Sequence, residues 1–545
     1  MKLKILPFSC LCLIAGSYII KTLEPLTDWL RWSDLTKIPL PKVPFNDSVY
    51  YLSQIRDVLA GDLTFGNPMF YEYENASFSF GNSSLFIVWG LFGLVFGLNL
   101  IQTYLVMVGI NSILLVIGFF LLSRQIAERN VAIISTLVSI LVFVEGIGRP
   151  SPTQQFVALV ALQLFCYLRL AQITKAKSGN SFFFIPFLVF AYLVLVSGNP
   201  LYSAFFLCFT ILNDLYYFRR LTWMTYYGIS VNLIYFLVMT LNTNSLEEMM
   251  GLRFGIHDTR FPGALRITIS CFVFCLLAAI ILIKFKNCLS GKLRKNLELI
   301  IILNVSLIIV VNSQLITGRA YEMEAHFFLL FKYLNAALAV PIFYHYVFCK
   351  FMANYANLQV LRGLFFVSLV ILLVSLSASG VMKEKSLSEN DLTRFMTAQA
   401  GSEEVILIEE DKDYQLSEAF ILLTHFRLYW HPYIAGSTAE NSEIVHRFAC
   451  SRESAMDFQE FSAFEDELFF HQFSNTELKL SRAKVLFPWL RKELSEFKII
   501  KKRFLMENYK TFVREFATCS QGNFKYKLDY IVKWNSPNYL TITSS

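Results

Sequence analysis

Long apolar runs separated by short polar loops fill the first 380 residues of the chain. A helix that crosses a bilayer needs about 20 mostly apolar residues, and the runs approach this length. The fold class expected is therefore mostly α, a polytopic membrane helical bundle of about eleven transmembrane helices. The predicted spans are 5–20, 100–122, 130–146, 156–172, 182–197, 201–218, 223–241, 265–284, 297–313, 327–349 and 363–380.

The run from Leu85 to Leu122 is longer than one crossing needs, so the positions of the basic residues decide its path. Lys and Arg concentrate in cytoplasmic loops. The basic clusters lie at Arg124 with Arg129, Lys175 with Lys177, Arg219 with Arg220, Lys284 to Lys295, and Lys350 with Arg362. They all fall inside only if Leu85 to Gly97 does not cross. With this number of crossings, the N-terminus lies in the cytoplasm, as a retained anchor, and the C-terminal segment lies outside.

The first outward loop, 21–99, contains a predicted amphipathic helix. Val49, Leu52, Ile55 and Leu59 recur at helical spacing, with Asp47 at the start of the helix. Asp is a favoured helix cap, so Asp47 has a structural role open to it as well as a chemical one. The two roles are compatible, because a cap at the mouth of a helix still faces the surrounding cavity.

After Gly380 the composition changes to mixed polar sequence, which predicts a C-terminal α/β extramembrane domain over 381–545. The domains expected are thus 1–380 in the membrane and 381–545 outside it. The elements expected in the second are a linker at 383–385, a strand at 403–409 with the apolar run 405–408, a helix at 416–425 and a strand at 525–534. Cys450 and Cys519 are its two cysteines; an external location allows them to pair, and the sequence alone leaves this open.

Composition agrees with a membrane protein. The mean hydropathy is +0.49 and 16% of the residues are charged, well below the quarter typical of soluble domains. The net charge of +7 is spread over short loops, which indicates orientation and no nucleic-acid partner. The sequence has no P-loop, GxGxxG on a strand, HExxH or Gly-x-Ser-x-Gly motif, which argues against an ATP-driven pump, a dehydrogenase, a zinc protease and an α/β-hydrolase.

Three outward loops carry residues suited to chemistry. Asp47 could take a proton from an acceptor group. Glu145 and Arg149 lie in a turn rich in Gly and Pro, where anchoring at the membrane boundary is the simpler role. A further outward loop, 242–262, has the composition of an ordinary polar loop and is not one of these three. The 312–326 loop holds Gln314, Arg319 and His326, and Arg319 offers a planar fork for a phosphate.

The order of these features resembles the membrane glycosyltransferases of the GT-C class, bacterial type, over residues 5–380. The resemblance implies Asp47 and Glu145 as catalytic residues and Arg149, Gln314, Arg319 and His326 as substrate-binding residues. It implies inverting transfer from a polyprenyl-phosphate sugar donor to a glycan, lipid or protein acceptor at the outer, periplasmic face. No metal ligand is assigned. The single acid of the first-loop motif, where members of the class often carry a pair, leaves a divalent cation open.

The resemblance also implies a location in the bacterial inner membrane, with membrane lipid as a partner. A transporter or assembly protein for lipid-linked glycans is the alternative of another class, and a glycan ligase or polymerase is a third. A transporter should carry charged or broken spans near the bilayer midplane, and these spans are mostly apolar. The transferase interpretation depends on one geometric expectation, namely that Asp47 and Arg319 meet above a single lipid-accessible hollow.

Overall fold

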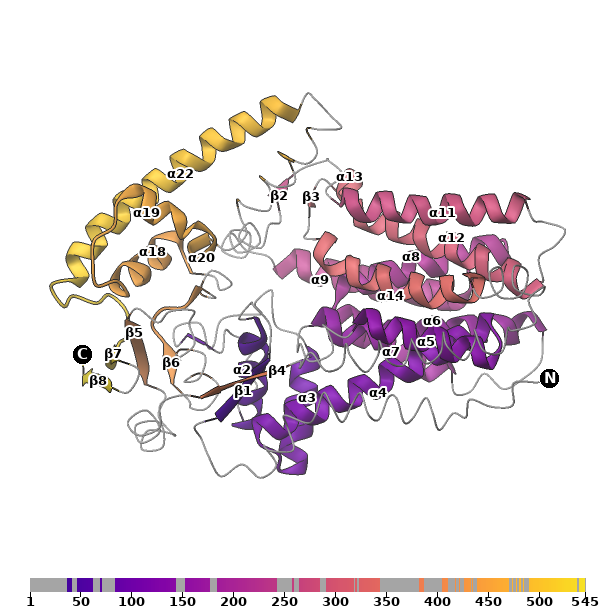
Figure 1. The fold of residues 1–545 in the computed structure, drawn as a ribbon, viewed down its shortest axis with the longest axis horizontal. Coiled ribbons are helices and arrows are strands. Elements are labelled where there is room, and N and C mark those ends of the chain that lie inside the picture. Colours follow the sequence, from indigo (N-terminus) through magenta and orange to yellow (C-terminus); the bar gives the residue numbers. More distant parts are fainter. Residues whose placement is uncertain are drawn as a thin grey trace, which may run out of the picture.

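The structure is a computed structural model in which a helical bundle lies beside a smaller mixed domain (Figure 1). It describes residues 37–41, 47–61, 69–70, 84–143, 152–176, 184–242, 257–258, 264–284, 291–317, 319–320, 323–343, 382–386, 404–409, 417, 421, 426–432, 434, 439–469, 473, 477, 480, 481, 484, 490–536 and 539–544. Side chains are described for most of these, though not for every one.

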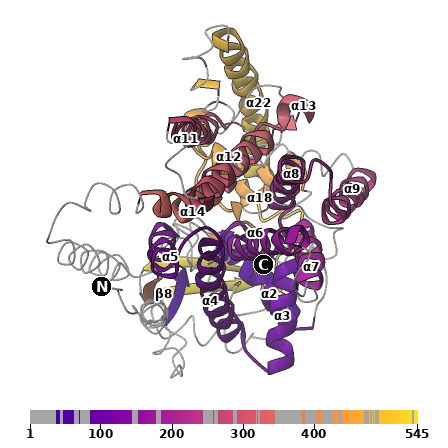
Figure 2. The ribbon, with the colours of Figure 1, turned by 90° about the vertical axis from the view of Figure 1, so that its right-hand side faces the viewer.

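The helices of the bundle run along the long axis of the molecule and pack around one another when seen end-on (Figures 1 and 2). They are α4 (Leu100–Ile126), α5 (Arg129–Phe143), α6 (Pro152–Ala176), α7 (Phe184–Gly198), α8 (Pro200–Tyr217), α9 (Trp223–Asn242), α11 (Leu265–Lys284), α12 (Gly291–Val311) and α14 (Met323–Phe343). Each overlaps one predicted span. The predicted spans 5–20 and 363–380 lie outside the described residues.

The length and composition of these helices identify a membrane protein. Four described stretches are long and apolar enough to cross a bilayer: Gln102–Ile126, Gln155–Thr174, Leu265–Lys284 and Leu293–Thr317. The other apolar helices are shorter, so the structure supports a membrane bundle without fixing the number of crossings at about eleven. Phe272 and Ile283 on α11 are largely exposed, as expected of a helix that faces lipid.

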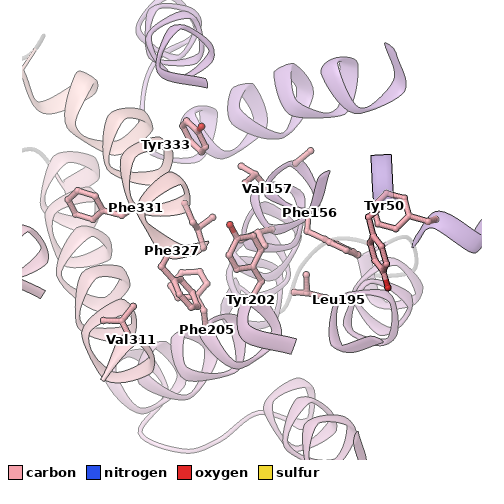
Figure 3. Close-up of a cluster of buried hydrophobic side chains, with 14 of the residues drawn as sticks. Tyr50, Phe156, Val157, Leu195, Tyr202, Phe205, Val311, Phe327, Phe331 and Tyr333 are labelled. Atoms are coloured by element: carbon pink, nitrogen blue, oxygen red, sulfur yellow. The ribbon is translucent and has the colours of Figure 1, made fainter. Parts of the chain in front are cut away.

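The interior of the bundle is rich in aromatic rings. Figure 3 shows Tyr202, Phe205 and Phe327 gathered at its centre, and the rings of Tyr202 and Phe327 are tilted against each other at 5.5 Å between centroids. Tyr50, from the first loop, belongs to the same cluster of buried side chains as Phe156 of α6 (Figure 3). The loop is therefore packed onto the bundle by a buried apolar side chain.

The segment between the loop and α4 forms a separate helix, α3 (Ser84–Phe96). Its thirteen residues span about 20 Å, which is short of the hydrocarbon thickness. It packs closely against α2 (Asp47–Leu59), because a Cβ added at Gly90 would lie 2.5 Å from Cβ of Val58. Asn99 then begins α4 with a capping box that it forms with Gln102.

The C-terminal domain contains a four-stranded sheet in the order β6-β5-β7-β8. Its strands are β5 (Val405–Glu409), β6 (Arg427–Leu428), β7 (Tyr530–Ser536) and β8 (Tyr539–Ser544), and β5 is parallel to both of its neighbours. The helices are α18 (Asn441–Cys450), α19 (Phe458–Ala463), α20 (Glu465–Phe469) and α22 (Leu490–Cys519). The α/β prediction for the domain therefore agrees with the described residues.

Two sequence predictions for this region need correction. The strand expected over 525–534 begins only at Tyr530, because the side chain of Lys525 turns to an ion pair with Glu515 and residues 525–529 form no ladder. The linker expected at 383–385 lies in a strand, β4 (Met382–Ser386), which pairs with β1 (Lys37–Pro41) of the first loop. Of the helix expected over 416–425, positions 417 and 421 are described, and both are helical.

A disulfide joins Cys450 at the end of α18 to Cys519 at the end of α22, across a sequence separation of 69 residues. A cross-link over a loop of this length removes much of the entropy of the unfolded chain. We expect Cys450→Ser, Cys519→Ser and the double variant each to lower the stability of the domain by about 2–5 kcal/mol. The urea concentration at which the domain becomes sensitive to protease, with and without reductant, measures this. A wild-type protein whose value does not change with reductant would contradict the prediction.

Candidate functional site

The centre of the candidate site is α2, which lies at the end of the bundle that faces the C-terminal domain (Figure 1). Leu52 and Ile55, two of the residues that predicted this helix, are buried. Tyr51 stacks on Phe86 of α3 at 4.8 Å between ring centroids. The predicted helix is confirmed, and Asp47 is its first residue. The side chain of Asp47 lies outside the described part of the structure.

The other end of α2 makes a buried ionic contact with the C-terminal domain. Asp57 accepts a hydrogen bond from Nε of Arg56 at 2.8 Å and one from a terminal nitrogen of Arg427 at 3.0 Å. The exposed fractions are 7% for Asp57, 6% for Arg56 and 4% for Arg427. We call these three residues the α2 clasp. A buried carboxylate between two guanidinium groups has its charge compensated, whereas loss of the carboxylate would leave two buried cations without their shared anion.

Main-chain bonds reinforce the clasp. Arg56 also donates to the carbonyl oxygen of Ile421. The amide of Leu428, in β6, donates to the carbonyl of Met69 in the first loop at 2.8 Å. Together with the pairing of β1 with β4, these contacts attach the first loop to the C-terminal domain at three places. The position of α2, and so of its first residue, depends on the C-terminal domain as well as on the bundle.

Sequence reasoning did not identify Arg427 as a site residue. The sequence does not indicate that Asp57 and Arg427 are partners, because the two residues are separated by 370 positions. The available signal was an Arg directly before the apolar run Leu428-Tyr429-Trp430, in a segment otherwise suited to a buried strand.

The loops 242–262 and 312–326 are joined to each other. β2 (His257–Asp258) pairs antiparallel with β3 (Arg319–Ala320), so that the backbone of Arg319 lies opposite Asp258. Asn312 donates to the hydroxyl of Thr268 on α11 at 2.8 Å, which fixes the start of the second loop. The loop read from its composition as an ordinary polar segment is thus a structural partner of the loop that carries Arg319.

The remaining predicted residues differ in how far the structure places them. Gln314 begins the short helix α13 (Gln314–Thr317) and is buried. His326 lies in the first turn of α14, and its side chain is outside the described set, as is that of Arg319. Glu145 and Arg149 both lie outside the described residues.

α2 and the β2–β3 ladder occupy the same end of the bundle, and the C-terminal domain lies at that end too (Figure 1). The first loop and the C-terminal domain therefore lie at the same end of the bundle. Whether the side chains of Asp47 and Arg319 share one hollow stays a prediction, as does the assignment of this end to the outer face.

The core of the C-terminal domain contains a second set of buried polar residues. Nδ1 of His446 is 2.7 Å from Glu515. Burial alone would raise the pKa of Glu515, but hydrogen bonds from Lys525, His446 and Arg514 outweigh it and lower the pKa to about 2. Arg447 lies over the ring of Tyr526 at 4.2 Å. These contacts hold α18 and α22 against the strand segment that follows.

His431, which follows β6, is fully buried, and burial lowers its pKa from 6.5 to about 3. It is neutral when the domain is folded and takes up a proton below about pH 6.5 when unfolded. The contribution of this histidine to the free energy of unfolding is therefore fully present above about pH 6.5 and is lost as the pH falls toward 3. The slope from this one group approaches about 1.4 kcal/mol per pH unit.

We therefore expect His431→Gln to flatten the loss of stability of the C-terminal domain between pH 6.5 and 5. The midpoint urea concentration for protease sensitivity, compared at the two pH values, measures this. The window lies above the range in which Glu515 would titrate. An unchanged slope in the variant would show that His431 is not the group being protonated.

Among the described residues, one group of side chains has the spacing of metal ligands. The ligand atoms of His446, Cys450 and Cys519 lie within 4.8 Å of one another. The two sulfurs are already joined in the disulfide, and Nε2 of His446 is 3.5 Å from Sγ of Cys450. The donor set is therefore used in holding the domain together.

Comparisons with known proteins give little beyond this. No family model and no curated protein matches the chain. Among solved structures, the chain is similar to the archaeal oligosaccharyltransferase AglB from Archaeoglobus fulgidus, which was determined with an inhibitory peptide and a dolichol-phosphate. The TM-score is 0.42 and the sequence identity 11%, over 76% of this chain and 64% of the archaeal one.

Proposed function

We propose that this protein transfers a sugar from a polyprenyl-phosphate-linked donor to an acceptor at the outer face of the membrane. The observation that carries the proposal is the placement of α2. A helix that begins with Asp47 is held between the membrane bundle and an extramembrane domain, at the end of the bundle where the Arg319 loop also lies. A lipid-linked donor can reach such a position from the bilayer, and a polar acceptor can reach it from outside.

The reaction would proceed as a single displacement. The carboxylate of Asp47 accepts the proton of an acceptor hydroxyl or amine, whose oxygen or nitrogen attacks the anomeric carbon. The bond from that carbon to the phosphate oxygen breaks, and the electron pair leaves with the lipid phosphate, so the configuration inverts. Arg319, His326 and Arg149 would neutralise the departing phosphate, Gln314 would help to bind the donor, and Glu145 would assist the base.

A transfer assay tests this function. Membranes that contain the protein are incubated with polyprenyl phosphates carrying different labelled sugars, and the label is followed into a product no longer attached to phosphate. The proposal predicts such a product, with inverted configuration, only when the protein is present. Labelled donor that moves between leaflets with no new glycosidic bond would support the transporter alternative instead. Transfer of whole lipid-linked chains, with no transfer of single sugars, would support the ligase.

A further inference from the structure

α22 is a helix of 30 residues, about 45 Å long, and more of its buried residues lie in its C-terminal half than in its N-terminal half. In the C-terminal half Phe512 and Glu515 are buried, and Cys519 is bonded to α18. The N-terminal half extends away from the sheet, toward the side of the molecule that carries α11 and α13 (Figures 1 and 2).

The two halves of α22 differ in charge. Residues 490–503 contain six basic and two acidic side chains, whereas residues 504–519 contain two of each. Lys501 is paired with Glu465 and Glu477, which ties one face of the N-terminal half to the preceding segment. Lys502 and Arg503 are exposed and have no ion-pair partner among the residues that the structure describes.

The same half exposes large apolar side chains. Ile499 and Ile500 are each 60% exposed, and they adjoin the basic run 501–503. On α13, at the end of the bundle, Ile316 is 80% exposed and Leu315 46%. Exposed isoleucines beside basic residues are typical of helices that lie at a membrane interface, where the apolar groups enter the lipid and the cations meet phosphates.

We propose that α22 meets the membrane through its N-terminal half, which binds anionic phospholipid head groups, with Ile499 and Ile500 inserted at the boundary. α13 meets the same surface from the bundle. The membrane would then hold the C-terminal domain at one end, while the α2 clasp holds it at the other.

The full-length protein in lipid nanodiscs tests this contact. p-Benzoylphenylalanine replaces Ile500, and the matched control carries it in place of Val513, which is 49% exposed on the packed half of α22. After illumination, mass spectrometry counts covalent lipid adducts. We expect adducts at position 500 in nanodiscs with anionic lipid and at least about tenfold fewer at position 513.

A second comparison tests the charge. With the photoreactive residue at position 500, the double variant Lys502→Glu/Arg503→Glu should lower the yield of lipid adducts about tenfold in anionic nanodiscs. A control that changes the exposed Lys510 to Glu, on the packed half, should leave the yield unchanged. Equal yields at positions 500 and 513, adducts to protein only, or no response to the Lys502 and Arg503 changes would each overturn the proposal.

Discussion

Replacing Asp47 by Asn is expected to lower sugar transfer by a factor of about 10²–10⁴, the usual contribution of a general base. Asn has nearly the same size as Asp and also caps helices well, so α2 should keep its start and its packing. The only function removed is the ability to accept a proton. Initial rates with labelled polyprenyl-phosphate sugars, at equal amounts of folded protein, measure the loss.

The matched control is Asp457→Asn. Asp457 is an exposed cap at the start of α19 in the C-terminal domain, where its side chain accepts a hydrogen bond from the amide of Glu460. The variant should transfer sugar at the wild-type rate. Transfer that survives unchanged in Asp47→Asn would remove this residue from the mechanism.

Breaking the α2 clasp is expected to have the largest effect on stability. Asp57→Asn leaves the buried guanidinium groups of Arg56 and Arg427 without their shared anion, and such an uncompensated charge typically costs about 3–5 kcal/mol. The C-terminal domain should become sensitive to protease at lower urea concentration. Transfer at saturating donor should also fall, because the clasp positions α2 and does not itself bind the donor.

Two further variants separate a lost charge partner from lost packing. Arg56→Met, Asp57→Leu and Arg427→Met together replace all three charges of the clasp by apolar groups and should recover much of the stability that Asp57→Asn loses. Lys492→Ala removes an ion pair with Glu496 that is largely exposed, and the effect should lie within about 0.5 kcal/mol of zero. An Asp57→Asn protein as stable as Lys492→Ala would show that the clasp does not contribute to stability.

The sequence predicted the parts of the fold that depend on local pattern. The bundle helices agree with the hydrophobic runs because a lipid-facing helix must be apolar along its whole length. The helix at Asp47–Leu59 was predicted because Leu52 and Ile55 fall on one face, and that face is buried. The strand at 405–409 was predicted because a short run of buried β-branched and aliphatic residues is typical of a central strand.

What the sequence did not predict depends on contacts between distant segments. Nothing near Asp57 indicates Arg427, and nothing near residues 383–385 indicates that they pair with residues 37–41. The pairing of Asp258 with Arg319 is of the same kind. These contacts are set by how the loops return to one end of the bundle, which no local periodicity records. They are also the contacts that would assemble the site.

The most direct test of the central geometry uses a polyprenyl-phosphate sugar with a photoreactive group next to the phosphate. The protein is illuminated with this donor in membranes, and the labelled peptides are identified by mass spectrometry. If Asp47 and Arg319 line one lipid-accessible hollow, labels will appear in both 44–51 and 312–326, and excess unlabelled donor will suppress both. Labels confined to one of these segments, or to loops at the opposite end of the bundle, would contradict a common site.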